Sequence, residues 1–173
     1  MQTLLDSLPG DYSGCMSNFA EVSKGGSANA SMINEQFPVI NYDDIAKQHC
    51  ADNDYGDFYK SNDALFVDTN SKFYFIEFKS GKFKPKELRN KSTNSIILAL
   101  DIGLAPSLRF FQDSVEYILV YELSALDKLN SNAEGLVETA IRNQEWLYKK
   151  AIPYTSKLFK KKFLALHFPG YTP

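Results

Sequence analysis

Residues 63–79 read DALFVDTNSKFYFIEFK. Two runs rich in β-branched and aromatic residues, 64–68 and 73–79, have the composition of strands. Between them, Thr69-Asn70-Ser71 has the small polar side chains typical of a turn. The stretch therefore predicts a β-hairpin. With a three-residue turn Asp68 pairs with Lys72, and this register brings Asp63 opposite Glu77 on the same face of the hairpin.

Apolar spacing along the rest of the chain predicts further elements. These are helices over residues 15–24, 42–50, 86–104 and 132–152, and strands over 37–41, 115–123 and 162–168. Strands that alternate with helices form a sheet covered by helices. We therefore expect an α/β protein with a mixed central β-sheet flanked by helices. At 173 residues the chain has the length of one domain, 1–173.

Composition narrows the class of protein. Apolar residues make up 44% of the chain and charged residues 23%, which is typical of a globular protein. No apolar run approaches the roughly 20 residues that span a bilayer, and the start has no basic segment followed by an apolar one. Cys15 and Cys50 belong to no CxxC motif, and no histidine is spaced to complete a zinc site with them. We expect a reduced, cytoplasmic protein without a membrane partner.

The net charge of −2 conceals strong polarisation along the chain. Residues 72–91 carry seven basic and two acidic side chains, and residues 142–173 carry seven basic and one acidic. Residues 1–71 and 92–141 are both acidic. Two basic clusters on an acidic chain can indicate an anionic partner such as nucleic acid. They can equally neutralise the acidic segments within the fold, and charge alone favours this second interpretation.

The predicted hairpin carries the residues that could take part in a chemical reaction. Glu77 is an acid inside an otherwise apolar strand, where an ionised carboxylate needs a cation or hydrogen bonds. Lys79 lies two residues on and leaves the same face. In the expected register the Cβ atoms of Asp63 and Glu77 lie about 5 Å apart, and two such carboxylates repel unless a cation separates them. Mg²⁺ prefers oxygen ligands of this kind. The pattern predicts a Mg²⁺-dependent site for phosphodiester hydrolysis.

Asp63, thirteen intervening residues and then Glu77-Phe78-Lys79 resemble the motif of the PD-(D/E)xK nuclease superfamily. The resemblance covers roughly residues 60–121 and implies a restriction-endonuclease-like αβββαβ core. It implies that Asp63, Glu77 and the backbone carbonyl of Phe78 bind Mg²⁺ or Mn²⁺, and that Lys79 assists the attacking water. Asn62 stands where the family name has proline.

The resemblance also implies residues outside the hairpin. Many members carry an acid on the first helix, and Glu21 and Glu35 both remain open as that residue. Residues on the helix after the ExK strand often contact phosphate or assist catalysis. The basic residues available to contact nucleic acid are Lys82, Lys84, Lys86, Arg89 and Lys91 after the hairpin, and Lys160, Lys161 and Lys162 near the end of the chain.

The resulting expectation is a nuclease that cleaves DNA or RNA, and a homodimer remains open. One alternative is a catalytically inactive module of the same fold that binds nucleic acid or a protein partner. Another is a structural protein in which Glu77 and Lys79 form an ordinary ion pair and Asp63 caps a turn. Asp68 is assigned to the turn, and His49 and His167 to structural roles.

Overall fold

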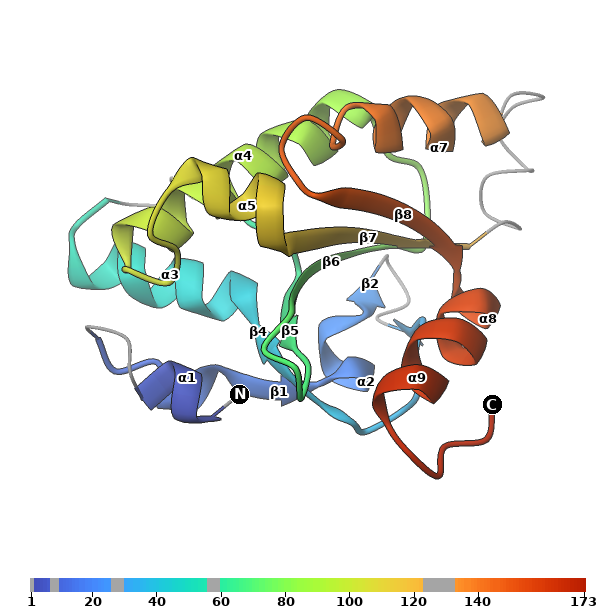
Figure 1. The fold of residues 1–173 in the computed structure, drawn as a ribbon, viewed down its shortest axis with the longest axis horizontal. Helices are drawn as coiled ribbons and strands as arrows, with labels where there is room; N and C mark the ends of the chain where they lie inside the picture. The colour runs from blue at the N-terminus through green and yellow to red at the C-terminus, as the bar shows by residue number, and fades with distance from the viewer. Residues whose placement is uncertain (1, 7–9, 26–29, 56–59, 123–132) are drawn as a thin grey trace.

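A computed structural model describes residues 2–6, 10–25, 30–55, 60–122 and 133–173 (Figure 1). It confirms an α/β fold built on a mixed six-stranded sheet with helices on both faces. The strand order is β1-β4-β5-β6-β7-β8. The strands are β1 (Met16–Asn18), β4 (Pro38–Asn41), β5 (Ala64–Val67), β6 (Phe73–Lys79), β7 (Val115–Tyr121) and β8 (Lys150–Thr155).

The pairing of neighbouring strands changes from antiparallel to parallel at β6. The neighbours from β1 to β6 are antiparallel, whereas β6, β7 and β8 are parallel. Parallel neighbours need long crossovers, and α4 (Pro85–Asp101) and α5 (Leu108–Ser114) lie in the crossover between β6 and β7. A separate two-stranded sheet pairs β2 (Lys24–Gly25) with β3 (Ala30–Ser31). Residues 26–29, between these two strands, lie outside the described residues.

The remaining helical segments are short, apart from α3 and α7. They are α1 (Gln2–Asp6), η1 (Ser13–Cys15), α2 (Phe19–Val22), α3 (Tyr42–Asp52), α7 (Ala133–Arg142), α8 (Ser156–Leu158), the π-helix η2 (Phe159–Leu164) and α9 (Ala165–His167). Helices α3, α4, α5 and α7 contribute to the core on one face, and α2 and η2 to the core on the other. Within the described ranges, no helix is both long and apolar enough to cross a membrane.

Alternation along β6 decides which residues reach each core. Phe75 packs with α3, α4 and α5, whereas Tyr74, Ile76 and Phe78 pack on the opposite face with α2 and η2. Successive side chains of a strand point to opposite faces, so Glu77 and Lys79 share the face of Phe75. The lone carboxylate of the strand therefore points toward the layer that contains α4.

The hairpin has the predicted register. Ala64 pairs with Ile76 and Val67 with Phe73, and the backbone N–H of Asp68 donates to the carbonyl of Lys72 at 3.0 Å. Oδ1 of Asp68 accepts hydrogen bonds from the backbone of Asn70 and Lys72. Asp68 is thus a turn residue, as expected.

Helix α4 is confirmed with small shifts at both ends. Pro85 stands at its first turn, where the missing N–H costs nothing. The helix ends before Gly103, whose φ of 70° is a conformation that glycine adopts without strain. Helix α3 and strands β4 and β7 also match their predicted segments closely, although residue 123 lies outside the described part.

Two predictions near the C-terminus are wrong. The helix expected over 132–152 ends at Arg142, and Lys150–Thr155 forms strand β8 instead. Pro153 does not prevent this, because β8 is an edge strand and proline is tolerated there. The strand expected over 162–168 is helical, because Phe159, Phe163 and His167 repeat every four residues. The rings of Phe159 and Phe163 stack with their centres 4.8 Å apart, and His167 lies tilted against Phe163 at 4.5 Å.

The helix expected over 15–24 is also wrong for most of its length. Residues Met16–Asn18 form β1, which pairs with β4, and only Phe19–Val22 are helical. Asn18 caps this short helix, and its side-chain oxygen accepts a hydrogen bond from the backbone of Glu21 at 3.0 Å. A cap residue favours helix initiation at its own position, so the helix starts later than the apolar pattern suggested.

Candidate functional site

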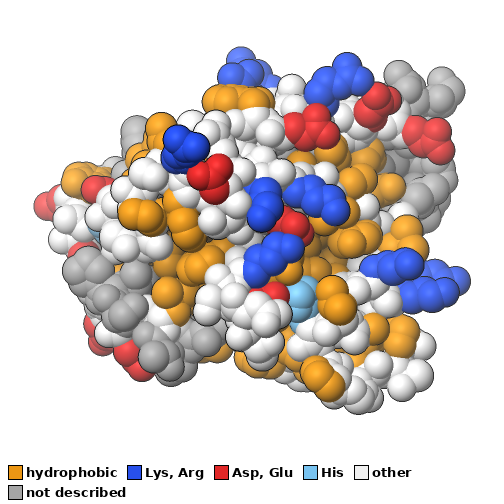
Figure 2. All heavy atoms as spheres, in the orientation of Figure 1, with side chains coloured by type: hydrophobic (Ala, Val, Ile, Leu, Met, Phe, Trp, Pro, Cys, Tyr) orange, Lys and Arg blue, Asp and Glu red, His pale blue; other side chains and the backbone are white. Residues whose placement is uncertain are grey.

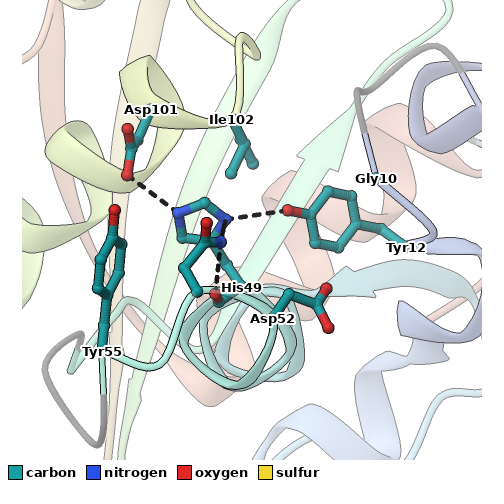
Figure 3. Close-up of a pocket in the computed structure, with 8 residues that line it drawn as sticks. Gly10, Tyr12, His49, Asp52, Tyr55, Asp101 and Ile102 are labelled. Atoms are coloured by element: carbon teal, nitrogen blue, oxygen red, sulfur yellow. Dashed lines mark hydrogen bonds and ion pairs between the residues drawn. The ribbon is translucent and has the colours of Figure 1, made fainter.

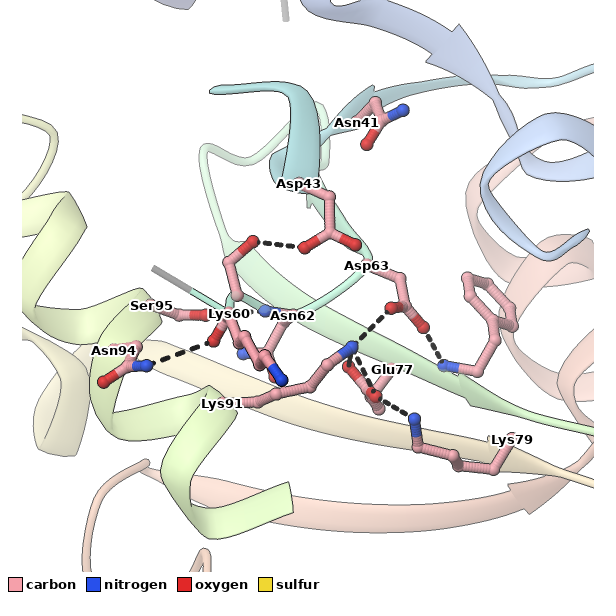
Figure 4. A network of polar contacts seen from close by, with 12 residues as sticks. Asn41, Asp43, Lys60, Asn62, Asp63, Glu77, Lys79, Lys91, Asn94 and Ser95 are labelled. Atoms are coloured by element: carbon pink, nitrogen blue, oxygen red, sulfur yellow. Dashed lines mark hydrogen bonds and ion pairs between the residues drawn. The ribbon is translucent and has the colours of Figure 1, made fainter. Parts of the chain in front are cut away.

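The candidate site lies at the carboxyl end of β6, between the sheet and α4 (Figure 4). Asp63 immediately precedes β5, and the register that pairs Ala64 with Ile76 brings it beside Glu77. Lys79 is the last residue of β6. The structure therefore brings together the three residues Asp63, Glu77 and Lys79, as the sequence predicted.

A fourth residue, Lys91 of α4, occupies the centre of the site. Its Nζ lies 2.8 Å from Oδ1 of Asp63 and 2.9 and 3.2 Å from the two carboxylate oxygens of Glu77 (Figure 4). Nζ of Lys79 approaches the same Glu77 from the other side, at 2.6 Å. The second oxygen of Asp63 accepts a hydrogen bond from the backbone N–H of Phe78 at 2.6 Å. Both carboxylates are thus oriented by donors on β6 and α4.

Burial sets the electrostatics of the site. The side chain of Glu77 is 0% exposed. Burial raises the pKa of Glu77 to about 7, and repulsion by Asp63 adds to this effect, while Lys91 and Lys79 oppose it. Burial acts against the charge of Lys91, but the attraction of Glu77, Asp63 and Asp43 outweighs it and raises the pKa of Lys91 well above its ordinary range. The ammonium of Lys91 is therefore held charged between carboxylates.

Asp43 is the third carboxylate near Lys91, and the sequence interpretation missed it. It stands in the first turn of α3, and one of its oxygens accepts a hydrogen bond from the hydroxyl of Ser61 at 2.6 Å. Burial raises its pKa, and Lys91 counteracts this. The backbone N–H of Tyr42 donates to the carbonyl of Asp63 at 3.1 Å, which ties the start of α3 to the site. The sequence contained a signal for Asp43, because a helix was expected to start at residue 42 and Asp43 is an acid in its first turn.

Asn62, the residue before Asp63, is held by hydrogen bonds to α4 and to Tyr148. Its backbone N–H donates to the hydroxyl oxygen of Ser95 on α4 at 2.7 Å, a bond that proline cannot make. Its side-chain amide donates to the hydroxyl of Tyr148 at 3.3 Å. Asn62 is fully buried, so it anchors the chain next to Asp63 against α4.

Neither upstream glutamate joins the site. Glu21 pairs with Lys24 at 2.6 Å on the surface. Glu35 pairs with Lys160 at 3.2 Å and accepts a hydrogen bond from Tyr171. These contacts engage both glutamates with partners other than Asp63, Glu77 and Lys79.

The basic residues predicted to bind nucleic acid occupy different settings. On α4, Lys86 and Arg89 line an open groove of about 570 Å³ together with Asn90, Thr93 and Asn94. The guanidinium of Arg89 lies 5.2 Å from the ring centre of Trp146, which is half exposed. Lys82 and Lys84 are exposed on the segment that leads into α4.

The C-terminal lysines follow β8 on η2. Lys160 is partly buried by its pairing with Glu35, whereas Lys161 and Lys162 are exposed. Figure 2 shows one face of the molecule, on which basic side chains gather both around acidic ones and separately from them. Each interpretation of the basic clusters thus has local support. Lys160 neutralises an acid within the fold, while the exposed lysines remain available to an anionic partner.

The donor set fits a divalent cation. Mg²⁺ in proteins commonly binds one or two carboxylates and completes its shell with waters and substrate phosphate, and Asp63 and Glu77 direct oxygens toward a common point. That point is marked by the ammonium of Lys91, a cation contributed by the chain itself. No cluster of three or more acidic, histidine or cysteine ligands occurs within the described ranges, so the chain would supply two carboxylates rather than a full cage.

A separate polar pocket of about 390 Å³ surrounds His49 (Figure 3). His49 bonds through Nε2 to Asp101 at 2.9 Å and through Nδ1 to the hydroxyl of Tyr12 at 3.2 Å. These contacts join α3 to the end of α4 and to the segment before η1. Both ring nitrogens are engaged in them, in agreement with the structural role expected for this histidine. His167 packs among Phe66, Tyr74 and Phe163.

Comparisons with family models, curated proteins and solved structures returned no match for this chain.

The buried carboxyl of Glu77 predicts a pH-dependent stability. Its pKa rises from 4.5 to about 7 on folding, so between these values the folded protein retains a proton that the unfolded chain releases. The contribution of this group to stability therefore falls as the pH rises through that window. Relative to wild type, Glu77→Gln is expected to gain free energy of unfolding between pH 5 and pH 7.5, by up to about 1.4 kcal/mol per pH unit.

Urea unfolding at a series of pH values measures this difference. Glu116→Gln, on the neighbouring strand β7, controls for the loss of a carboxylate that pairs with Lys72 at 2.7 Å. A difference between wild type and Glu77→Gln that stays constant over the window would show that Glu77 does not titrate as the burial requires.

Proposed function

We propose that this protein is a Mg²⁺- or Mn²⁺-dependent nuclease that hydrolyses phosphodiester bonds of DNA or RNA. One observation carries the proposal: Asp63, just before β5, and Glu77, on β6, share one cation between them, the ammonium of Lys91, with Lys79 beside it. Within a buried site, paired carboxylates around a cation are costly to maintain for stability alone. Their convergence therefore supports a chemical role.

The chain's own residues have distinct roles in this proposal. Asp63 and Glu77 hold the divalent ion, with the backbone carbonyl of Phe78 as the further ligand that the resemblance implies. When bound, the ion supplies Lewis-acid activation of water and neutralises phosphate charge. Phe78 also fixes Asp63 through its backbone N–H, at 2.6 Å from the carboxylate oxygen, which keeps Asp63 in place.

Lys79 is suited to act on the water and the phosphate. Its side chain is 23% exposed and its Nζ rests on Glu77, so it lies between the buried carboxylates and solvent. An ammonium in this position can orient an attacking water and stabilise negative charge that develops on the phosphate. Lys79 thus sits where the substrate would meet the site.

The surrounding fold supports the same proposal. Strands β4, β5 and β6 form an antiparallel unit, and α4 connects β6 to the parallel strand β7. This arrangement has the strand–helix–strand order of the core that the resemblance implies. It differs in that α3 is inserted between β4 and β5. Arg89 lines the groove along α4 and also lies over the half-exposed ring of Trp146, so a nucleic acid bound there can contact both cations and an aromatic ring.

The position of Lys91 favours a second candidate function. An internal ammonium between the two carboxylates can replace a divalent ion permanently, as expected for a catalytically inactive module that still binds nucleic acid. Such a module would bind nucleic acid equally well in EDTA and in Mg²⁺, and would cleave it in neither.

Removal of Lys79 is expected to abolish cleavage. Lys79→Ala should lower the cleavage rate at least about a hundredfold, in the range measured for loss of a group that stabilises transition-state charge, and leave the fold intact. The assay is cleavage of labelled single-stranded and duplex DNA and RNA in Mg²⁺ or Mn²⁺. Arg109→Ala, which removes an exposed cation on α5, is the matched control and should retain wild-type activity.

Two results would contradict the proposed reaction. Cleavage in EDTA equal to that in Mg²⁺ would exclude a metal-dependent mechanism. Full activity in Lys79→Ala would remove this lysine from the chemistry, whatever the metal requirement.

The two basic clusters are expected to contribute differently to nucleic-acid binding. Each phosphate contact that is lost should reduce the slope of log affinity against log salt by about 0.7–0.9. The triple replacement of Lys84, Lys86 and Arg89 by Ala removes cations on or beside α4 and should weaken binding, flatten the salt dependence and slow cleavage.

The corresponding replacement of Lys160, Lys161 and Lys162 should flatten the slope less, because Lys160 is partly buried in its ion pair with Glu35, whereas Lys84, although 3.6 Å from Glu87, is 81% exposed. It should weaken binding more than it slows cleavage at saturating substrate. Salt titrations of both variants measure the two slopes. If neither slope changes, the basic clusters serve only to balance the acidic segments.

A further inference from the structure

Lys91 stands out because it neutralises the two carboxylates that the proposed function assigns to a metal. We propose that Lys91 is a competing cation: its ammonium holds Asp63 and Glu77 together in the metal-free protein and must leave that position when a divalent cation binds. This inference rests on the proposed function, and it adds a control on metal loading that is built into α4.

The geometry separates Lys91 from Lys79. Nζ of Lys91 lies within 3.2 Å of three carboxylate oxygens from two different side chains. Nζ of Lys79 forms an ion pair with Glu77 alone. Lys91 therefore bridges the pair, whereas Lys79 rests at its edge.

A divalent ion and this ammonium cannot occupy the site together. Mg²⁺ binds carboxylate oxygens at about 2.0–2.1 Å, so an ion held by both Asp63 and Glu77 must lie in the space between them. Lys91 Nζ lies in that same space, 2.8 and 2.9 Å from their oxygens. Steric overlap and repulsion between like charges therefore require one cation to leave.

Lys91 has a means to move and a partner to receive it. Its side chain is 22% exposed and is attached to the middle of α4 by a flexible stem of four carbons. Asp43 on α3 lies close enough to attract it electrostatically, and the structure gives no direct ion pair between the two. Asp43 can thus stabilise the displaced ammonium without contacting it beforehand.

The exchange of Lys91 for a divalent ion changes the net charge of the site. With Asp43, Asp63, Glu77, Lys79 and Lys91 all ionised, the metal-free site carries a net charge of about −1, which repels a phosphodiester. A divalent ion changes this to about +1, which attracts it. Loading of the metal therefore converts the site from one that repels the substrate to one that attracts it.

Manganese binding, measured by electron paramagnetic resonance, tests the competition directly at pH 8. Lys91→Met should tighten Mn²⁺ binding about tenfold or more, because it removes the competing cation and not just a distant charge. Lys79→Met is the matched control: it removes the same charge from the same glutamate but does not free the position between the two carboxylates, so it should tighten binding clearly less than Lys91→Met does. Lys91→Arg, which keeps a cation, should remain close to wild type.

A double replacement examines the partner for the displaced lysine. If Asp43 receives Lys91, then Asp43→Asn should weaken Mn²⁺ binding more in the wild-type background than in Lys91→Met, where only the loss of its negative charge acts. Equal weakening in both backgrounds would overturn its role as the receiving carboxylate.

Chemical labelling of the wild-type protein provides a readout that needs no variant to fold. Lys91 should react slowly with acetic anhydride in EDTA, while it is held by two carboxylates, and severalfold faster in saturating Mg²⁺. Mass spectrometry gives the ratio for each lysine, with Lys47 on α3 as an exposed reference. Labelling of Lys91 that is equally slow with and without bound metal would overturn the proposal.

The outcomes distinguish this inference from the proposed function. Asp63→Asn should abolish Mn²⁺ binding if the ion occupies the proposed site. If it does and Lys91→Met tightens binding no more than Lys79→Met, the competition fails while the metal site stands. If neither wild type nor Lys91→Met binds Mn²⁺ through Asp63, then the metal site and the competition both fail, and the inactive module is the better account.

Discussion

The buried carboxylate of Glu77 must be neutralised, and the arrangement around the end of β6 follows from that requirement. Lys79 reaches it from the same strand, and Lys91 reaches it from α4. Because Lys91 also contacts Asp63, the same ammonium joins the helix to both strands of the hairpin. The crossover between β6 and β7 is thereby fixed at its polar end by charge and along the rest of its length by the apolar core.

The ion pairs among Asp63, Glu77, Lys79 and Lys91 are a costly way to stabilise the fold. Buried ion pairs often contribute less than apolar residues of the same volume, since desolvation of the charges offsets their attraction. The neighbours of Glu77 on the same face, among them Phe75 and Leu65, show that apolar side chains pack well there. The presence of two carboxylates and two lysines at one point of this core is the reason we propose a chemical role for them.

The hairpin and its register could be predicted because both depend on local rules. Strand alternation, a three-residue turn and the capping side chain of Asp68 lie within seventeen consecutive residues, and together they place Asp63 opposite Glu77. Sequence alone also marked the lone acid of β6 as a residue that needs a cation.

Lys91 and Asp43 could not be assigned in the same way. Lys91 was one of several basic residues on a helix, and only the packing of α4 on the sheet shows that it turns inward while Lys86 and Arg89 line an outer groove. The failure near the C-terminus has a similar cause. The run 162–168 suits a strand by composition. The helical repeat of Phe159, Phe163 and His167 becomes informative only once Phe159 and Phe163 are seen to pack against Phe66, Tyr74 and Phe78.

The central claim is that Asp63 and Glu77 form a cation site in which Lys91 takes the place of a metal. The most direct measurement is the anomalous scattering of crystals grown without metal and then soaked in Mn²⁺. The account predicts a peak bonded to oxygens of both Asp63 and Glu77, with Nζ of Lys91 moved out of the space between them. Crystals that show no peak at this position, with Lys91 still bridging the two carboxylates at saturating Mn²⁺, would contradict it.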